Sequence, residues 1–305
     1  MLANLNQRAV FAKIALAPAG VAALLYWASQ HGTVSLNAEL SLLLLGAALA
    51  LLSVFPFSLR LREVLKLIDY QISELEIVRI QTQSMFYYFF VPLSVGTEVS
   101  KFAKLKNLQP DIGSTQLAST ILLDHFVGLV VLILLSVGLF VAIDPVVVQF
   151  NQTTLYWLFS GGALAGIFAW MYLRTKNPFI VKSILAAIGG NKRNLALAGS
   201  YSLMMHLLIA GAVTAGAINW HIEISYLEVL FVLTGAFLFQ MIPINLIGVS
   251  AIEIAGTGLY LAVGLTISEA VSLVSLLYCY RILIALVGGV WEFIDAWKIR
   301  QRQAH

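Results

Sequence analysis

Long apolar runs separated by short polar connections dominate the chain. A helix needs roughly 17–25 apolar residues to cross a bilayer. The pattern predicts spanning helices over residues 10–29, 40–57, 117–141, 154–173, 195–218 and 271–293. Two further apolar stretches, 81–96 and 226–264, are interrupted by proline and glycine. We therefore expect a bundle of spanning helices that is broken at two places.

Residues 58–80 follow a different pattern. Apolar residues recur there at helical spacing among charged ones, which include Arg60, Arg62, Glu63 and Lys66. This spacing predicts an amphipathic helix lying on the membrane surface. An ordinary cytoplasmic loop helix is the alternative. Residues 178–190 form a shorter amphipathic piece that ends in Gly-Gly.

The two interrupted stretches share one order of residues. Each runs from a proline through a glycine to a lone carboxylate: Pro92, Gly96 and Glu98 in the first, and Pro243, Asn245, Gly248 and Glu253 in the second. Irregular backbone is tolerated at membrane depth where it is buried in protein or lines a cavity. Broken helices in matching places are typical of transporters built from inverted repeats. The pattern predicts two re-entrant hairpins that meet at a site near the bilayer midplane.

Composition defines the class of protein. The 305 residues are 60% hydrophobic and 11% charged, whereas soluble domains carry about 25% charged residues. The chain is therefore expected to be an all-α polytopic membrane protein. A single cysteine, Cys279, excludes a disulfide framework and a pair of cysteine metal ligands. We expect no cofactor, no metal and no nucleic-acid partner.

Charge placement predicts the orientation, because lysine and arginine near span ends stay cytoplasmic. If both interrupted stretches dip into the membrane and return, every basic residue except Arg281 becomes cytoplasmic. Both termini are then cytoplasmic, in a bacterial-type inner membrane. This arrangement predicts one membrane domain, 1–305, with two inverted repeats, about 1–145 and about 146–300, around a central cavity.

Ionisable groups inside spans cost roughly 2.5–3.5 kcal/mol on insertion scales, so each needs a reason. Lys101 follows Glu98 by one helical turn and can share its face. These two could hold a phosphate at the free N–H groups of a new half-helix, or Glu98 could simply cap that helix. Arg281 is the expected partner of Glu253. It either contacts a lipid phosphate, which arginine binds bidentately, or neutralises the carboxylate.

Three further ionisable side chains lie inside predicted spanning helices. We expect Asp124 and His125 to pair with Lys101 or Lys104 at the cytoplasmic mouth, with a proton relay as the alternative. We expect His206 to be a buried histidine whose hydrogen bonds are satisfied.

The residues around the two breaks resemble the signatures of a known family. The signature Pro-Gly-x-x-Gly-Glu-x-x-Arg of the flippase-like membrane domain of lysylphosphatidylglycerol synthases, and of its free-standing relatives, is similar to the run Pro92, Gly96, Thr97, Glu98 and Lys101. The second signature, Pro-x-Ser-x-Gly-Gly-x-Gly-x-x-Glu, is similar to the run Pro243, Asn245, Gly248 and Glu253. The resemblance covers about residues 10–297. Leu93 replaces the usual glycine, Lys101 stands where arginine is common, and the second run keeps one glycine.

The resemblance implies transbilayer movement of a phosphate-bearing anionic lipid, either a phospholipid or a polyisoprenyl-phosphate carrier. The sequence holds no nucleotide-binding motif, so movement by alternating access would be passive or coupled to protons. It also holds no soluble aminoacyl-transferring domain, so lipid aminoacylation is not implied. We expect a transporter and not an enzyme. The alternatives are a scaffold, or a membrane-embedded enzyme or accessory subunit acting on lipid-linked substrates in envelope biosynthesis; the oligomeric state stays open.

Overall fold

Helices make up the described structure almost entirely. The computed structural model describes residues 39–90, 96–143, 189, 191–241, 245–246 and 249–303. Its helices are α2 (Leu40–Leu65), α3 (Glu74–Phe90), α4 (Gly96–Leu108), α5 (Ser114–Ala142), α8 (Lys192–Asn219), α9 (Tyr226–Leu238), α10 (Ala251–Ala262) and α11 (Ile267–Gln303), with single 3-10 turns η2 (Lys66–Ile68) and η3 (Phe239–Met241). The exception is one antiparallel pair of two-residue strands, β1 (Asn245–Leu246) and β2 (Val249–Ser250). The predicted all-α class is confirmed for this part of the chain.

Four of the described helices are long and apolar enough to cross a membrane: Leu40–Ile68, Ser114–Ala142, Lys192–Asn219 and Ile267–Lys298. Each contains a predicted spanning helix, and the chain is a multi-pass membrane protein. Helices α9 and α10, with 13 and 12 residues, are shorter than the roughly 17 residues that a span requires. The predicted helices over 10–29 and 154–173, and nearly all of 178–190, lie outside the described residues.

The surface helix predicted over 58–80 is wrong. Residues 58–65 continue α2 beyond Pro56, the chain turns at Asp69 in the left-handed region with φ 58, and α3 then begins at Glu74. Two of the charged side chains are buried and not on a free surface, because Arg60 is 4% exposed and Glu63 is 3% exposed. Polar side chains that contact other helices can recur at the same helical spacing as the polar face of a surface helix. The sequence pattern alone does not distinguish the two, which explains the error.

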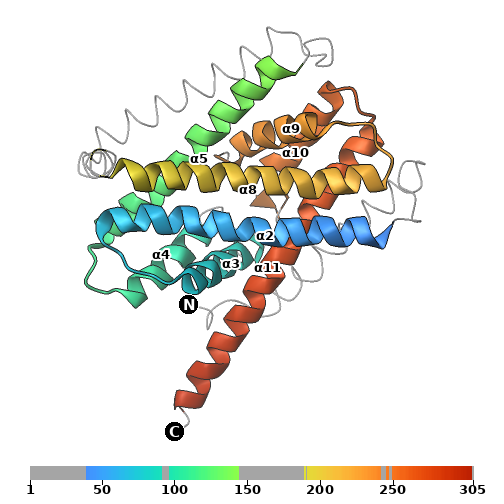
Figure 1. The fold of residues 1–305 in the computed structure, drawn as a ribbon. Helices are drawn as coiled ribbons and strands as arrows, with labels where there is room; N and C mark the ends of the chain where they lie inside the picture. The colour runs from blue at the N-terminus through green and yellow to red at the C-terminus, as the bar shows by residue number, and fades with distance from the viewer. Residues whose placement is uncertain are drawn as a thin grey trace.

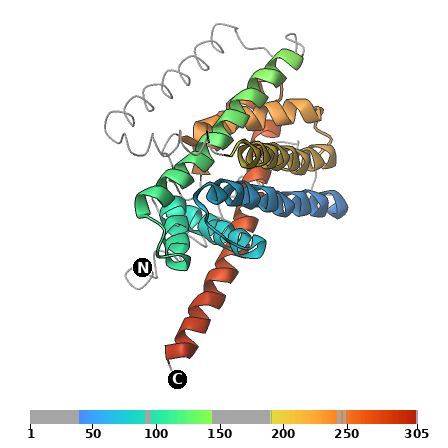
Figure 2. The same ribbon diagram turned by 60° about the vertical axis from the view of Figure 1, so that its left-hand side comes forward.

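The bundle is built around α2 and α8, which run side by side (Figures 1 and 2). Their close approach depends on Gly46, because a Cβ there would lie 2.9 Å from the carbonyl oxygen of Ala212. The largest hydrophobic core of the described structure includes Val213 of α8, Phe231 of α9 and Tyr260 of α10. The core thus fixes the second half of the chain against α2.

Each interrupted stretch forms a pair of helices that pack against each other, α3 with α4 and α9 with α10. Five residues separate α3 from α4 in sequence, and Leu105 near the end of α4 shares a core cluster with Ile77 and Ile80 near the start of α3. The two helices therefore run antiparallel, and we call them the first hairpin. Three features stay predictions: entry of the two helix pairs into the membrane, the inverted symmetry of the repeats, and a central cavity.

The long helix α11 connects the two halves of the protein. It crosses the bundle obliquely and projects beyond it toward the C-terminus (Figures 1 and 2). It packs along α3, where a Cβ on Gly288 would lie 1.9 Å from the carbonyl oxygen of Thr82. Only glycine fits at this contact, so the backbones of α3 and α11 meet directly. Asp295 of α11 adds contacts to Arg79 and Gln83 of α3.

Candidate functional site

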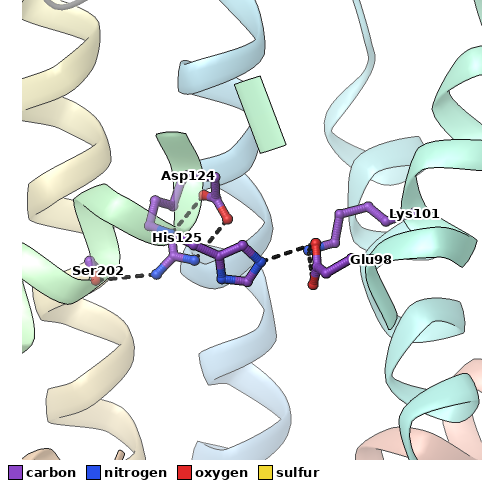
Figure 3. Close-up of polar contacts among 6 residues, drawn as sticks. Glu98, Lys101, Asp124, His125 and Ser202 are labelled. Carbon is purple, nitrogen blue, oxygen red and sulfur yellow. Dashed lines mark hydrogen bonds and ion pairs between the residues drawn. The ribbon is translucent and has the colours of Figure 1, made fainter. Parts of the chain in front are cut away.

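The first part of the site lies at the start of α4. Glu98 is in the first turn of this helix, and the ammonium of Lys101 donates to both of its carboxylate oxygens at 3.2 Å. His125 of α5 reaches the same carboxylate, with its Nε2 3.0 Å from Oε2 of Glu98 (Figure 3). The expected contact between Glu98 and Lys101 is confirmed. Lys101 is 1% exposed, so this contact is shielded from water on the lysine side.

Electrostatics keep Glu98 charged. Burial favours the neutral acid, but the charge of Lys101 and the hydrogen bond and charge of His125 outweigh it and lower the pKa of Glu98 to about 2. The favourable contribution of this carboxylate to stability is therefore present above its ordinary pKa and is lost only as the pH falls toward about 2. Glu98 is ionised throughout the physiological pH range while these contacts are closed.

The second part of the site lies at the start of α10. Glu253 is the third residue of this helix, and its Oε2 accepts hydrogen bonds from the backbone N–H and hydroxyl of Ser250 at 2.6 and 2.7 Å. This is a capping box, which satisfies free donors at a helix N-terminus. The other oxygen, Oε1, accepts a hydrogen bond from Nη1 of Arg281. Glu253 thus both caps the helix and pairs with the predicted arginine.

Arg281 also touches the first hairpin. It lies on α11 and is 6% exposed. Its guanidinium lies 5.0 Å from the ring centre of Tyr88 and 5.8 Å from that of Phe89, both on α3. Aromatic faces attract cations, more strongly where water is excluded. The last turn of α3 therefore contacts the charged pair that belongs to the second interrupted stretch.

A further ion pair, buried on both sides, joins α2 to α5. Nε and Nη2 of Arg60 donate to the two oxygens of Asp124 at 2.8 and 2.9 Å, and Nη1 lies 3.4 Å from the hydroxyl of Ser202 on α8. The predicted pairing of Asp124 and His125 with Lys101 or Lys104 is wrong, because His125 meets Glu98 instead. Asp124 meets Arg60 because α2 continues past its predicted end, and Lys104 pairs with Glu292 of α11. In Figure 3, Ser202 lies to the left of the His125 ring and Glu98 lies to its right. Asp124 lies above the ring.

Sequence reasoning missed Arg60 because it placed this residue on the membrane surface. One signal could have found it: no helix breaker follows Pro56 before Asp69, so the apolar helix had no reason to stop. Gly128 on α5 makes room for the arginine, because a Cβ there would lie 2.5 Å from Nη1 of Arg60.

His206 of α8 is 3% exposed, which confirms that it is buried. Its hydrogen bonds are not satisfied as predicted, because neither ring nitrogen has a partner among the described residues. The imidazole instead lies beside the ring of Phe237, with 5.7 Å between the ring centres.

A comparison with protein families identifies the chain. The family model of the lysylphosphatidylglycerol synthase transmembrane region matches residues 10–288. The chain belongs to this family. The resemblance inferred from the two broken-helix signatures is thereby confirmed. No curated protein and no solved structure matches the chain.

The structure describes only part of the residues that carry the family signatures. Gly96 is the first residue of α4, and Asn245 pairs with Ser250 in the short strand ladder. Three predicted site residues lie outside the described part: Pro92, Pro243 and Gly248. Among the residues that are described, no group of three or more metal-ligating side chains could hold a metal ion.

Proposed function

We propose that this family member moves a phosphate-bearing anionic lipid between the two leaflets of the membrane. One observation carries the proposal: the Glu253–Arg281 pair is buried at the start of a broken helix and contacts α3 of the other interrupted stretch. A charged pair in this position costs free energy and marks a substrate or ion pathway. Membership of a lipid-related membrane family supports lipid as the substrate.

The two carboxylate–cation pairs suggest how a head group is taken up. A lipid phosphate offers several acceptor oxygens and can replace a carboxylate as the partner of a cation. Arg281 would bind it through parallel hydrogen bonds, as guanidinium groups do. Lys101 would bind it as a point charge at the N-terminal end of α4, where the helix dipole also favours an anion. The acyl or isoprenyl tail would stay in the bilayer.

Helix α11 is suited to couple the two sites during alternating access. It carries Arg281 and also packs backbone to backbone on α3 at Gly288. A shift of the first hairpin would therefore carry α11 with it and move Arg281 relative to Glu253 of α10. In this account the opening of one carboxylate–cation pair changes the surroundings of the other, as alternating access requires.

The charge state of Glu98 bears on energy coupling. Since its pKa is lowered to about 2 by Lys101 and His125 despite burial, a proton can bind this carboxylate near neutral pH only after the contacts have opened. Passive movement needs no such step. We therefore favour passive exchange down the lipid gradient, with proton coupling as an outcome that a pH series of transport rates would show.

Movement of labelled lipid in liposomes tests the proposed function. The purified protein should speed transfer of a tail-labelled anionic phospholipid or polyisoprenyl phosphate between leaflets. Replacing both carboxylates, Glu98→Gln with Glu253→Gln, removes two charge-assisted contacts and should slow transfer by about tenfold to a hundredfold. The exposed Glu223 provides a matched control, and Glu223→Gln should leave the rate unchanged.

The same measurement can contradict the proposal. Transfer by the wild-type protein no faster than in protein-free liposomes would exclude lipid movement by this chain alone. Undiminished transfer by the double variant would exclude the two carboxylates from the mechanism.

A further inference from the structure

Helix α4 meets α11 through one charged pair. The ammonium of Lys104 on α4 contacts the carboxylate of Glu292 on α11, and the two side chains are 24% and 13% exposed. Among the described residues, no other ion pair joins these two helices. The pair lies outside the head-group contacts proposed for Lys101 and Arg281.

One face of α11 carries Glu292 together with the second part of the site. Arg281 precedes Glu292 by eleven residues, which is about three helical turns and about 16 Å along the axis. Gly288 lies between them and meets the backbone of α3 at Thr82. At 100° per residue, these three positions on α11 fall within about 40° of one another. Because a helix is rigid over three turns, a displacement of Glu292 is transmitted to Arg281.

Helix α4 carries the first part of the site, one turn away from the same charged pair. Lys101 precedes Lys104 by three residues, which is about one turn of the helix, and its ammonium contacts Glu98. The charged pair thus links the helix that carries Lys101 to the helix that carries Arg281.

The other described contacts of α4 run to α2, α3 and α5. Leu105 packs in a cluster that includes Leu61 of α2 and Leu117 of α5. Glu98 meets His125 of α5. Helix α3 needs no such link to α11, because the backbones of these two helices are in contact. The charged pair therefore adds α11 to the helices with which α4 moves.

We propose that the Lys104–Glu292 pair couples the two carboxylate–cation pairs of the site by making α4 move with α11. Opening of Glu98 from Lys101 then displaces α11 and loosens Glu253 on α10. Lys104 and Glu292 are positioning residues, because they act through these pairs and not on the substrate. The inference rests on the proposed lipid movement and specifies how its two sites communicate. Such coupling is a free energy shared between sites, and it falls when the link is cut.

Hydrogen exchange of the solubilised full chain tests the coupling without any lipid movement. Glu98→Gln weakens the first site and should speed exchange of the amides at the start of α10, around Glu253, by about twofold to fivefold. Adding Glu292→Gln, which removes the charge and keeps the side-chain shape, should remove most of this response. Adding Asp295→Asn instead should preserve it. An equally large response with and without Glu292→Gln would overturn the coupling.

Asp295→Asn is a matched control because it changes a neighbouring carboxylate of the same helix. Asp295 pairs with Arg79 of α3, and these side chains are 24% and 25% exposed. Its loss leaves α3 held to α11 by the backbone contact at Gly288 and leaves the Lys104–Glu292 pair intact.

Transfer of a tail-labelled anionic phospholipid in liposomes measures the consequence for lipid movement. Glu292→Gln should slow transfer by about twofold to fivefold, whereas Asp295→Asn should leave the rate unchanged. Reversing the charges, Lys104→Glu with Glu292→Lys, rebuilds the pair and should restore the rate. Equal slowing in the two single variants, or no recovery on reversal, would overturn the positioning role.

Two further readouts separate the possible failures. The melting temperatures of Glu292→Gln and Asp295→Asn in detergent should agree, since each variant loses one partly exposed ion pair. Transfer rates that simply follow the melting temperatures would overturn the positioning role. If the exchange response depends on Glu292 but no variant and no wild-type protein moves lipid, the proposed function fails and the coupling stands.

Discussion

Replacing Asp124 with alanine is expected to lower the free energy of unfolding by about 3–5 kcal/mol. The substitution leaves the guanidinium of Arg60 without its bidentate partner at a site where this arginine is only 4% exposed. Ser202, 3.4 Å from Nη1, offers a long hydrogen bond and no charge. Denaturant unfolding of the protein in detergent micelles measures the loss.

Two control variants test whether burial of the unpaired arginine causes this loss of stability. Glu74→Ala removes the exposed pair with Arg62, whose side chains are 54% and 24% exposed, and should cost less than about 1 kcal/mol. Arg60→Met with Asp124→Leu replaces the buried pair by apolar groups and should recover most of the stability lost in Asp124→Ala. A loss for Asp124→Ala no larger than that for Glu74→Ala would contradict burial of the pair.

Replacing Arg281 with lysine is expected to slow lipid movement by about tenfold or more while changing stability much less. Lysine keeps a positive charge beside Glu253, which preserves the ion pair. It lacks the planar fork that binds a phosphate through two parallel hydrogen bonds, and losing one charge-assisted hydrogen bond corresponds to about tenfold in rate. Transfer rates in liposomes and unfolding in detergent, measured on the same preparation, separate the two effects.

The control for this variant is Arg193→Lys, at an exposed position of α8, which should change neither quantity. Parallel losses of transfer and stability in Arg281→Lys would favour the other role considered for this residue. Arg281 would then neutralise Glu253 for folding and would not contact the substrate.

Long apolar runs allowed the sequence to predict two of the described spanning helices closely. The helix expected over 117–141 is Ser114–Ala142, and that expected over 195–218 is Lys192–Asn219. The Glu253–Arg281 pair was also predictable, because Arg281 was the only arginine expected within a spanning helix. A carboxylate buried within the membrane needs a cation as its partner, and Arg281 was the one arginine placed there by the predicted spans.

Contacts between helices were harder to predict, because the sequence does not show which faces meet. The charged residues near position 60 looked like the polar face of a surface helix. In the structure Arg60 contacts Asp124 of α5 and Ser202 of α8, so it takes the place expected of a lysine beside Asp124. Glu253 caps α10 and also pairs with Arg281, two roles of one carboxylate that the sequence pattern did not show together.

The central claim is that Lys101 and Arg281 hold the phosphate of a membrane lipid, and native mass spectrometry of the gently solubilised protein tests it most directly. The wild-type protein should retain a phosphate-bearing anionic lipid. The variant Lys101→Gln with Arg281→Lys should release it, while a variant carrying Arg193→Lys alone should retain it. Equal amounts of the same anionic lipid on the wild-type protein and on the double variant would contradict the claim.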